Sequence, residues 1–210
     1  MHSAHRVTET KLMDLTYLVN AYERPWELLG CLVSLRQQTH QDFEVIVLDN
    51  QTVDAIAREN LASLAMMRCE KFRYVRTCQE KPYQASDFGA QMANGEFLCF
   101  PSDDSYYVPA FGEKMLAAAR GNAWDLVYCD AILRPSTTSP RRQGIYVPLL
   151  VEPRMDYIDK TLFIVRKSVF PGFRCDERPY WTGADAYVVE EMVSRGVSHG
   201  RVPEPLAVHN

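Results

Sequence analysis

The chain has 210 residues, of which 47% are hydrophobic and 24% are charged. These fractions are typical of globular proteins and exclude a collagen-like, coiled-coil or disordered chain. The formal net charge is −4, from 23 Lys and Arg against 27 Asp and Glu. This balance argues against a nucleic-acid partner, because dedicated nucleic-acid-binding proteins usually carry a basic field. The length is that of about one domain.

The six cysteines are scattered and form no C-x-x-C pair, so zinc-ribbon and thioredoxin interpretations are excluded. Several lie in apolar runs, where a free thiol behaves as a small hydrophobic group. Reduced cysteines predict a cytoplasmic protein. No segment reaches the roughly 18 apolar residues of a membrane-spanning helix, which leaves open only peripheral contact with a membrane. Residues 1–12 are polar, lack the apolar core of a signal peptide and are predicted to form a mobile tail.

Strands and helices are predicted to alternate in the first half of the chain. The apolar spacing of Leu28, Leu32 and Leu35 predicts a helix that begins at Pro25. The neighbouring segments are predicted as follows: a strand at 15–19, a turn at 20–25, a strand at 43–48, a helix at about 54–66 and a strand at 72–75. Such alternation is typical of an α/β fold built from parallel crossover units.

The following segments are less regular. Ser86 is predicted to cap a short helix that Gly95 ends. A buried strand at 97–100 leads into the polar run Ser102-Asp103-Asp104-Ser105. Beyond it, the sequence predicts a helix at 109–119, a strand at 126–129, a polar loop at 134–143, a strand at 159–165 and a helix at 184–195.

Acidic residues recur just after the predicted strands, at Asp49 and at Asp103-Asp104. Ligands of open α/β sheets bind outside the carboxyl ends of the strands. The sequence contains neither G-x-G-x-x-G nor the Walker phosphate loop, so the common glycine-rich phosphate cradles are excluded. Carboxylates at this edge suit a phosphorylated ligand if a divalent cation such as Mg²⁺ lies between them.

Two stretches resemble a known family. YERPWELLGCLVSLRQQTHQDFEVIVLDN is similar to the opening of the inverting family 2 glycosyltransferases, and DFGAQMANGEFLCFPSDDSYYVP is similar to their N-x-G-x-x-x-A-x-G-E-Y-I-x-F-L-D-x-D-D-x-x-x-P pattern. The resemblance is strong over 15–109 and weak over 159–209. It implies the GT-A fold, a Rossmann-type α/β/α sandwich with a mixed, mostly parallel central sheet. One domain would span 13–210, with a nucleotide-binding half at 13–109 and an acceptor and catalytic half at 110–210.

The resemblance also implies roles for individual residues. Asp49 would accept a hydrogen bond from the ring N–H of a uracil-type base, and Asp185 would be the general base. Asp104 would bind the metal, with His209 as a further ligand, and Asp103 would approach the ribose or the metal shell. Asp87 stands where the family has Asn and would alter contacts near the ribose or phosphates. The nucleoside would be bordered by Val19, Asn20, Ala21 and Glu23.

The activity implied is transfer of a single sugar from a UDP-linked nucleotide-sugar donor to an acceptor hydroxyl, with inversion at the anomeric carbon. The acceptor would be a glycan, a lipid-linked sugar or another hydroxyl compound. Mn²⁺ or Mg²⁺ would assist the reaction. The Q-x-x-R-W signature of the processive synthases is absent, which favours single additions. Ser102 stands where the family's D-x-D has its first Asp, so this chain has one carboxylate fewer for the metal.

Plainer explanations exist for each candidate. Asp49 could be a turn residue, Asp103-Asp104 a polar turn, and Asp185 a partner for a helix dipole. Two other functions stay open at this point. One is a non-catalytic nucleotide-sugar-binding module of the same fold, which Ser102 and the short length favour. The other is a nucleotidyltransferase, although such enzymes usually carry a glycine-rich loop with a basic residue after the first strand, where this chain has NAYER.

Overall fold

The structure is a computed structural model that describes residues 13–79, 81–133, 147–149, 158–173 and 184–209. The tail predicted at 1–12 and the loop predicted at 134–143 lie outside the described residues. No helix among the described residues is both long and apolar enough to cross a lipid bilayer.

Strands and helices alternate through most of the chain. The first half contains β1 (Met13–Ala21), α1 (Pro25–Arg36), β2 (Phe43–Asn50), α2 (Asp54–Met67), β3 (Phe72–Thr77), α3 (Pro82–Met92) and β4 (Gly95–Cys99). The second half contains β5 (Tyr106–Tyr107), α4 (Phe111–Asn122), β6 (Leu126–Leu133), β7 (Val147–Leu149), the short 3₁₀ helix η2 (Lys160–Leu162), β8 (Phe163–Arg166), the short 3₁₀ helix η3 (Lys167–Val169), α5 (Ala184–Ser194) and β9 (His199–His209).

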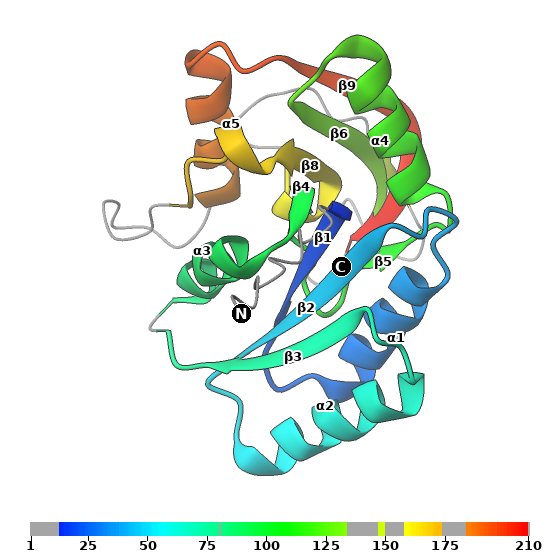
Figure 1. The fold of residues 1–210 in the computed structure, drawn as a ribbon, viewed down its shortest axis with the longest axis vertical. Coiled ribbons are helices and arrows are strands. Elements are labelled where there is room, and N and C mark those ends of the chain that lie inside the picture. The colour runs from blue at the N-terminus through cyan, green and yellow to red at the C-terminus, as the bar shows by residue number, and fades with distance from the viewer. Residues whose placement is uncertain (1–12, 80, 134–146, 150–157, 174–183, 210) are drawn as a thin grey trace, which may run out of the picture.

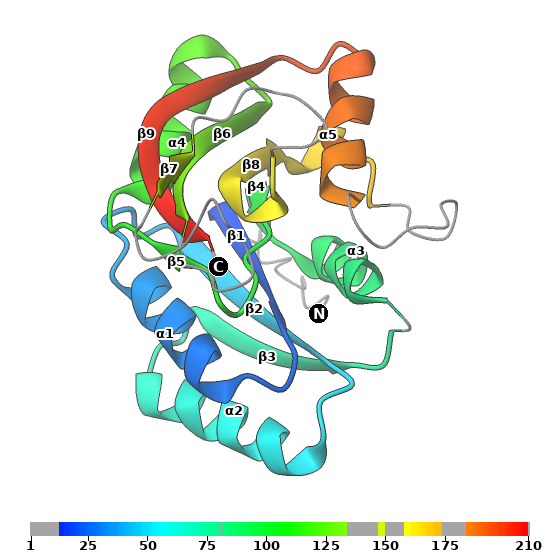
Figure 2. The ribbon, with the colours of Figure 1, turned by 180° about the vertical axis from the view of Figure 1, so that it is seen from behind.

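One mixed sheet of nine strands connects the described elements, in the order β3-β2-β1-β4-β8-β6-β9-β5, with β7 paired to β6. The run β3-β2-β1-β4 is parallel, whereas β8 is antiparallel to both β4 and β6. Helices α1 and α2 lie on one side of these parallel strands and α3 on the other (Figures 1 and 2). This arrangement confirms the predicted α/β fold with a mixed central sheet.

The reversal of strand order around β1 determines where a ligand can bind. The chain moves outward from β1 through β2 to β3, then returns to form β4 on the other side of β1. Because parallel crossovers are right-handed, the returning helix α3 must cover the opposite face. Open α/β sheets bind their ligands at such a reversal, so the expected ligand crevice lies at the carboxyl ends of β1 and β4.

The prediction for Ser86 and Gly95 is wrong. Helix α3 begins at Pro82, and the side-chain oxygen of Gln84 accepts the Lys81 amide at 3.0 Å. Ser86 is a fully buried residue inside this helix, and Gly95 begins β4 instead of ending a helix. Proline at the first helical position, which lacks an amide hydrogen to satisfy, is the signal that marks the true start.

Two further segments differ from the sequence prediction. Asp159 does not begin a strand, because its carboxylate accepts the Thr161 amide at 2.8 Å and caps η2, so that β8 starts only at Phe163. Strand β9 has no counterpart among the predicted elements, since Pro203 and Pro205 argue against a strand. The structure accommodates these prolines at irregularities in the β6–β9 register.

Gly95 is required at the start of β4 by the close approach of β1. A Cβ atom at this position would lie 2.5 Å from the Thr16 main-chain nitrogen. We expect Gly95→Ala to lower the free energy of unfolding by about 1–3 kcal/mol, because the backbone must shift. Urea denaturation measures this change. Gly121→Ala, in a helix with open space around it, is the control and should leave stability equal or higher; equal effects of both variants would contradict the steric explanation.

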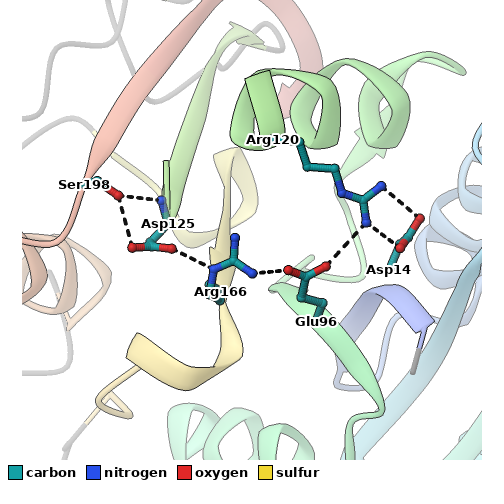
Figure 3. A network of polar contacts seen from close by, with 6 residues as sticks. All are labelled: Asp14, Glu96, Arg120, Asp125, Arg166 and Ser198. Carbon is teal, nitrogen blue, oxygen red and sulfur yellow. Dashed lines mark hydrogen bonds and ion pairs between the residues drawn. The ribbon is translucent and has the colours of Figure 1, made fainter. Parts of the chain in front are cut away.

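A polar network ties the opposite edge of the sheet together (Figure 3). Arg120 of α4 pairs with Asp14 and Glu96 at the starts of β1 and β4, and Arg166 of β8 pairs with Glu96 and with Asp125. Arg166 Nε lies 2.7 Å from Asp125 Oδ1. Because Asp14 and Glu96 lie at the amino ends of their strands, this network lies away from the ligand crevice and has a structural role.

Candidate functional site

The segments after β1 and β4 bring Arg24 into contact with Asp103 and Asp104, which we call the acidic pair. Asn20 and Ser102 form a parallel main-chain bridge, and the Asp103 amide donates to the Asn20 carbonyl at 3.0 Å. The guanidinium of Arg24 then reaches both carboxylates, with Nη2 2.5 Å from Asp103 Oδ1 and Nη1 2.6 Å from Asp104 Oδ2. The acidic pair and its cation are therefore brought together by loops that follow neighbouring parallel strands.

The two carboxylates of this pair have different environments. Asp103 is buried, and its Oδ2 accepts the Tyr22 amide at 2.9 Å. Burial raises the pKa of Asp103 to about 6, against the opposing effects of the Tyr22 amide and the Arg24 guanidinium. The Asp104 side chain is 14% exposed. Asp103 is thus fixed in the protein, while the Asp104 carboxylate keeps partial access to solvent.

Asp49 lies at the end of β2 and is completely buried. Its Oδ2 accepts hydrogen bonds from the Asn60 amide, at 3.1 Å, and from the Tyr74 hydroxyl. Its Oδ1 has no hydrogen-bonding partner among the described residues. Burial and the contact with Asp49 raise the pKa of the Tyr74 hydroxyl, which stays protonated and donating. One acceptor oxygen of Asp49 is therefore still available for an N–H donor.

The residues predicted to border a nucleoside follow β1 into its loop. Val19 and Ala21 are buried strand residues, and the side-chain amide of Asn20 donates to the Ser86 hydroxyl at 2.8 Å. Glu23 is exposed and has a positive φ of 51°. The predicted turn therefore begins two residues later than expected, since Asn20 and Ala21 still belong to β1.

Asp185 lies in the first turn of α5 and is held from two other elements. Its Oδ1 accepts the Tyr83 hydroxyl of α3 at 3.2 Å, and its Oδ2 accepts the Lys160 amide of η2 at 3.1 Å. Burial is the main cause that raises the pKa of Asp185, and the nearby Asp159 carboxylate is the second. The result is an oriented carboxylate that is more basic than an exposed one.

Lys160 is electrostatically coupled to both the acidic pair and Asp185. Its side chain is buried, and its Nζ lies 5.2 Å from the centroid of the Tyr83 ring. Burial lowers the pKa of Lys160, while the surrounding carboxylates of Asp159, Asp185, Asp103 and Asp104 oppose this shift. This ammonium is therefore within electrostatic range of both groups of acidic residues.

The remaining two candidates are placed less directly at the crevice. Asp87 of α3 accepts the Phe173 amide at 2.8 Å, beside Gly172, whose positive φ of 83° turns the chain toward it. This bond links α3 to the segment after η3. His209 ends β9 and pairs in register with Leu133, but its side chain lies outside the described part of the structure.

No group of three or more His, Cys, Asp and Glu residues that could hold a metal ion is found among the described residues. Asp104 nevertheless presents a partly accessible carboxylate beside the buried Asp103. Hard cations such as Mg²⁺ are commonly bound by one or two carboxylates together with substrate phosphates. The Asp103 and Asp104 carboxylates therefore fit a cation that is bound partly by the protein and partly by a diphosphate. They do not form a complete metal site by themselves.

Residues 17–187 match the family model for glycosyl transferase family 2. The chain belongs to glycosyltransferase family 2. EpsH of Bacillus subtilis (strain 168), provisionally named a glycosyltransferase, is 30% identical over 122 residues, which cover 58% of this chain and 34% of that protein. An uncharacterized glycosyltransferase of Haemophilus influenzae is 27% identical over 143 residues, which cover 67% of this chain and 45% of that protein. The chain thus spans less than half the length of these two relatives.

Solved structures of other proteins have the same fold. TarS of S. aureus (residues 1–349, in complex with UDP) superposes with a TM-score of 0.72 at 15% identity, over 94% of this chain and 60% of that one. The mannosyltransferase PcManGT of Pyrobaculum calidifontis, in complex with GDP-Man and Mn²⁺, has a TM-score of 0.72 at 12% identity, over 95% of this chain and 57% of that one. These similarities confirm the predicted GT-A fold.

Three residues at the crevice were missed by the sequence interpretation: Arg24, Tyr83 and Lys160. Arg24 directly follows Glu23, the last residue predicted to border the nucleoside. Its position just after β1 could have indicated that it pairs with Asp103 and Asp104. A lysine in front of the apolar run TLFIV was the signal for Lys160. Tyr83 had no signal, because its contact with Asp185 joins positions 102 residues apart.

Proposed function

We propose that this chain transfers a single sugar from a nucleotide-sugar donor, UDP-linked, to an acceptor hydroxyl with inversion at the anomeric carbon. The observation that carries the proposal is the oriented Asp185 carboxylate, held at both oxygens and made more basic by burial. Membership of family 2 supports it. UDP and UDP-GlcNAc are the ligands described for the fold relative TarS.

The proposed reaction is a direct displacement. The acceptor oxygen attacks the anomeric carbon while its proton moves to the Asp185 carboxylate, which is general-base catalysis. The bond between the anomeric carbon and the diphosphate oxygen breaks, and its electron pair leaves with the nucleoside diphosphate. The hydrogen bonds from Tyr83 and Lys160 orient the carboxylate for this transfer, and correct orientation replaces part of the entropic barrier.

The donor would lie along the ends of β1, β2 and β4. Asp49 Oδ1 is proposed to accept the ring N–H of the base, since it has no other partner among the described residues. Because Asp49 is completely buried, a base can reach it only when covering side chains move. Asn20, Glu23 and the buried strand residues Val19 and Ala21 would border the nucleoside, and Asp87 would adjust contacts near the ribose or phosphates through α3.

Asp104 is proposed to bind Mn²⁺ or Mg²⁺ with the diphosphate, with Asp103 beside it and His209 as a further ligand. A metal bound there would act as a Lewis acid toward the leaving diphosphate. The structure of PcManGT with GDP-Man and Mn²⁺ supports this assignment by fold similarity. Arg24 forms ion pairs with the same two carboxylates, so a metal at Asp104 would compete with Arg24 for this side chain.

We expect UDP and Mn²⁺ together to stabilise the chain far more than either alone. The carboxylates repel a diphosphate without metal, and the metal alone finds few protein ligands. Ligand at 100 times its dissociation constant adds about 2.7 kcal/mol, which is roughly 5–10 °C in melting temperature for a chain of this size. Thermal unfolding without ligand, with UDP, with Mn²⁺ and with both measures the effect.

Asp104→Ala should remove this synergy and change the ligand-free melting temperature by only a few degrees. Glu191→Ala is the matched control, because Glu191 of α5 is a similarly exposed carboxylate, at 17%, that pairs with Arg195 just after this helix. It should retain the synergy. An equal UDP shift with and without Mn²⁺ would contradict the shared-metal site and favour the non-catalytic binding module or a metal-independent enzyme.

A further inference from the structure

The side chain of Lys160 is a buried cation that the proposed displacement does not use. Only 7% of the residue is exposed. Within the described part of the chain, its ammonium has no hydrogen-bonded or ion-paired carboxylate, and its Nζ lies over the Tyr83 ring, 5.2 Å from the centroid. Burying an ammonium without a bonded anion is costly, so its retention requires an explanation.

The fold places Lys160 on the side of the sheet's carboxyl edge that holds the acidic pair, within electrostatic range of Asp103 and Asp104. Strand β8 runs antiparallel to β4, with Cys99 opposite Ile164. Continuing this register beyond the strand ends leads from β4 toward Asp103 and from β8 back toward Lys160. The electrostatic influence of Asp103 and Asp104 on Lys160 agrees with this placement. The ammonium is therefore within electrostatic range of the groups at the carboxyl end of β4, where the ligand crevice is expected.

On its other side, Lys160 adjoins Asp185. The Lys160 amide donates to Asp185 Oδ2, and Tyr83, whose ring lies under the ammonium, donates to Asp185 Oδ1. In a direct displacement the attacked carbon lies between the base and the leaving diphosphate. A cation within range of both Asp185 and Asp104 is therefore next to the bond that breaks.

We propose that the Lys160 ammonium binds the diphosphate of the donor and neutralises part of the charge that develops on it as the sugar leaves. This inference rests on the proposed function and adds a residue to it. A diphosphate would supply the anionic oxygen that the described residues do not hydrogen-bond to this ammonium. A charge-assisted hydrogen bond in a buried site is also among the stronger polar contacts.

The test compares ligands that do and do not contain phosphate. UDP, uridine and inorganic pyrophosphate are titrated by calorimetry, with and without Mn²⁺, into wild type, Lys160→Met and Lys160→Arg. We expect Lys160→Met to bind UDP and pyrophosphate at least tenfold more weakly and uridine unchanged, and Lys160→Arg to recover much of the UDP affinity. Lys114→Met is the matched control, because Lys114 forms a surface ion pair with Glu204 on the far strand β9, and it should alter none of these affinities.

A second measurement needs no variant and so is independent of folding. Bound UDP should shift the Cε resonance of Lys160 in the wild-type chain, read by NMR with ¹³C-labelled lysine, while uridine should leave it unchanged. UDP affinity in Lys160→Met equal to that of wild type, or no shift of the Lys160 resonance on adding UDP, would overturn the assignment. These results do not depend on sugar transfer: a chain that binds UDP through Lys160 but transfers no sugar would refute the proposed function alone.

Discussion

Asp185→Asn is expected to reduce sugar transfer by about 10²–10⁴-fold, the typical contribution of a general base. The amide keeps the shape of the side chain but cannot accept the acceptor proton. Donor binding should change little, because Asp185 lies on α5 and not at the ends of β1, β2 and β4. Single-turnover transfer and UDP affinity, measured side by side, separate the two effects.

Glu190→Gln is the matched control, since it removes an exposed carboxylate from the same helix. It should transfer at the wild-type rate. The wild-type rate should also fall as the pH drops through the pKa of Asp185, because only the ionised form accepts a proton. Burial and Asp159 raise this pKa, so the loss should occur at higher pH than for an ordinary carboxyl group. Wild-type turnover by Asp185→Asn would exclude Asp185 as the base.

Asp49→Asn is expected to weaken binding of uridine about ten- to hundredfold. The lost interaction is a hydrogen bond from the base N–H to a charged acceptor, which contributes about 1.5–3 kcal/mol. Asparagine is preferred to alanine here, because Asn60 and Tyr74 both donate to Asp49 and would lose their acceptor. Calorimetry with uridine and cytidine measures the change, since cytidine has a ring acceptor where uridine has the N–H.

The preference for uridine over cytidine should decrease in Asp49→Asn. Asp54→Asn serves as control, because Asp54 is a nearby carboxylate that is 79% exposed and pairs with Arg76. It should leave the preference unchanged. Equal uridine affinity in wild type and Asp49→Asn would remove Asp49 from the base site, and tighter binding of a guanine nucleotide than of UDP would contradict the choice of donor.

The first half of the fold could be predicted from the sequence because its signals are local. Each of these signals, the leucine spacing of α1, the continuous apolar run of β2 and the acidic residues at the ends of β2 and β4, spans only a few neighbouring positions. Strand β9 could not be predicted in this way, because Pro203 and Pro205 are tolerated only through irregular pairing with a strand about 70 residues earlier. The same holds for η2, where one Asp159 hydrogen bond replaces the expected strand.

The sequence by itself determined the fold class, the family resemblance and the carboxylates that this chain offers at the ends of its strands. Only the tertiary structure decided how these groups are paired. Arg24 meets Asp103 and Asp104 because β1 and β4 are neighbours in the sheet. Tyr83 and Lys160 orient Asp185 because α3, η2 and α5 converge. Such contacts join residues up to about 100 positions apart, and their energies depend on burial and distance, which no local pattern of residues encodes.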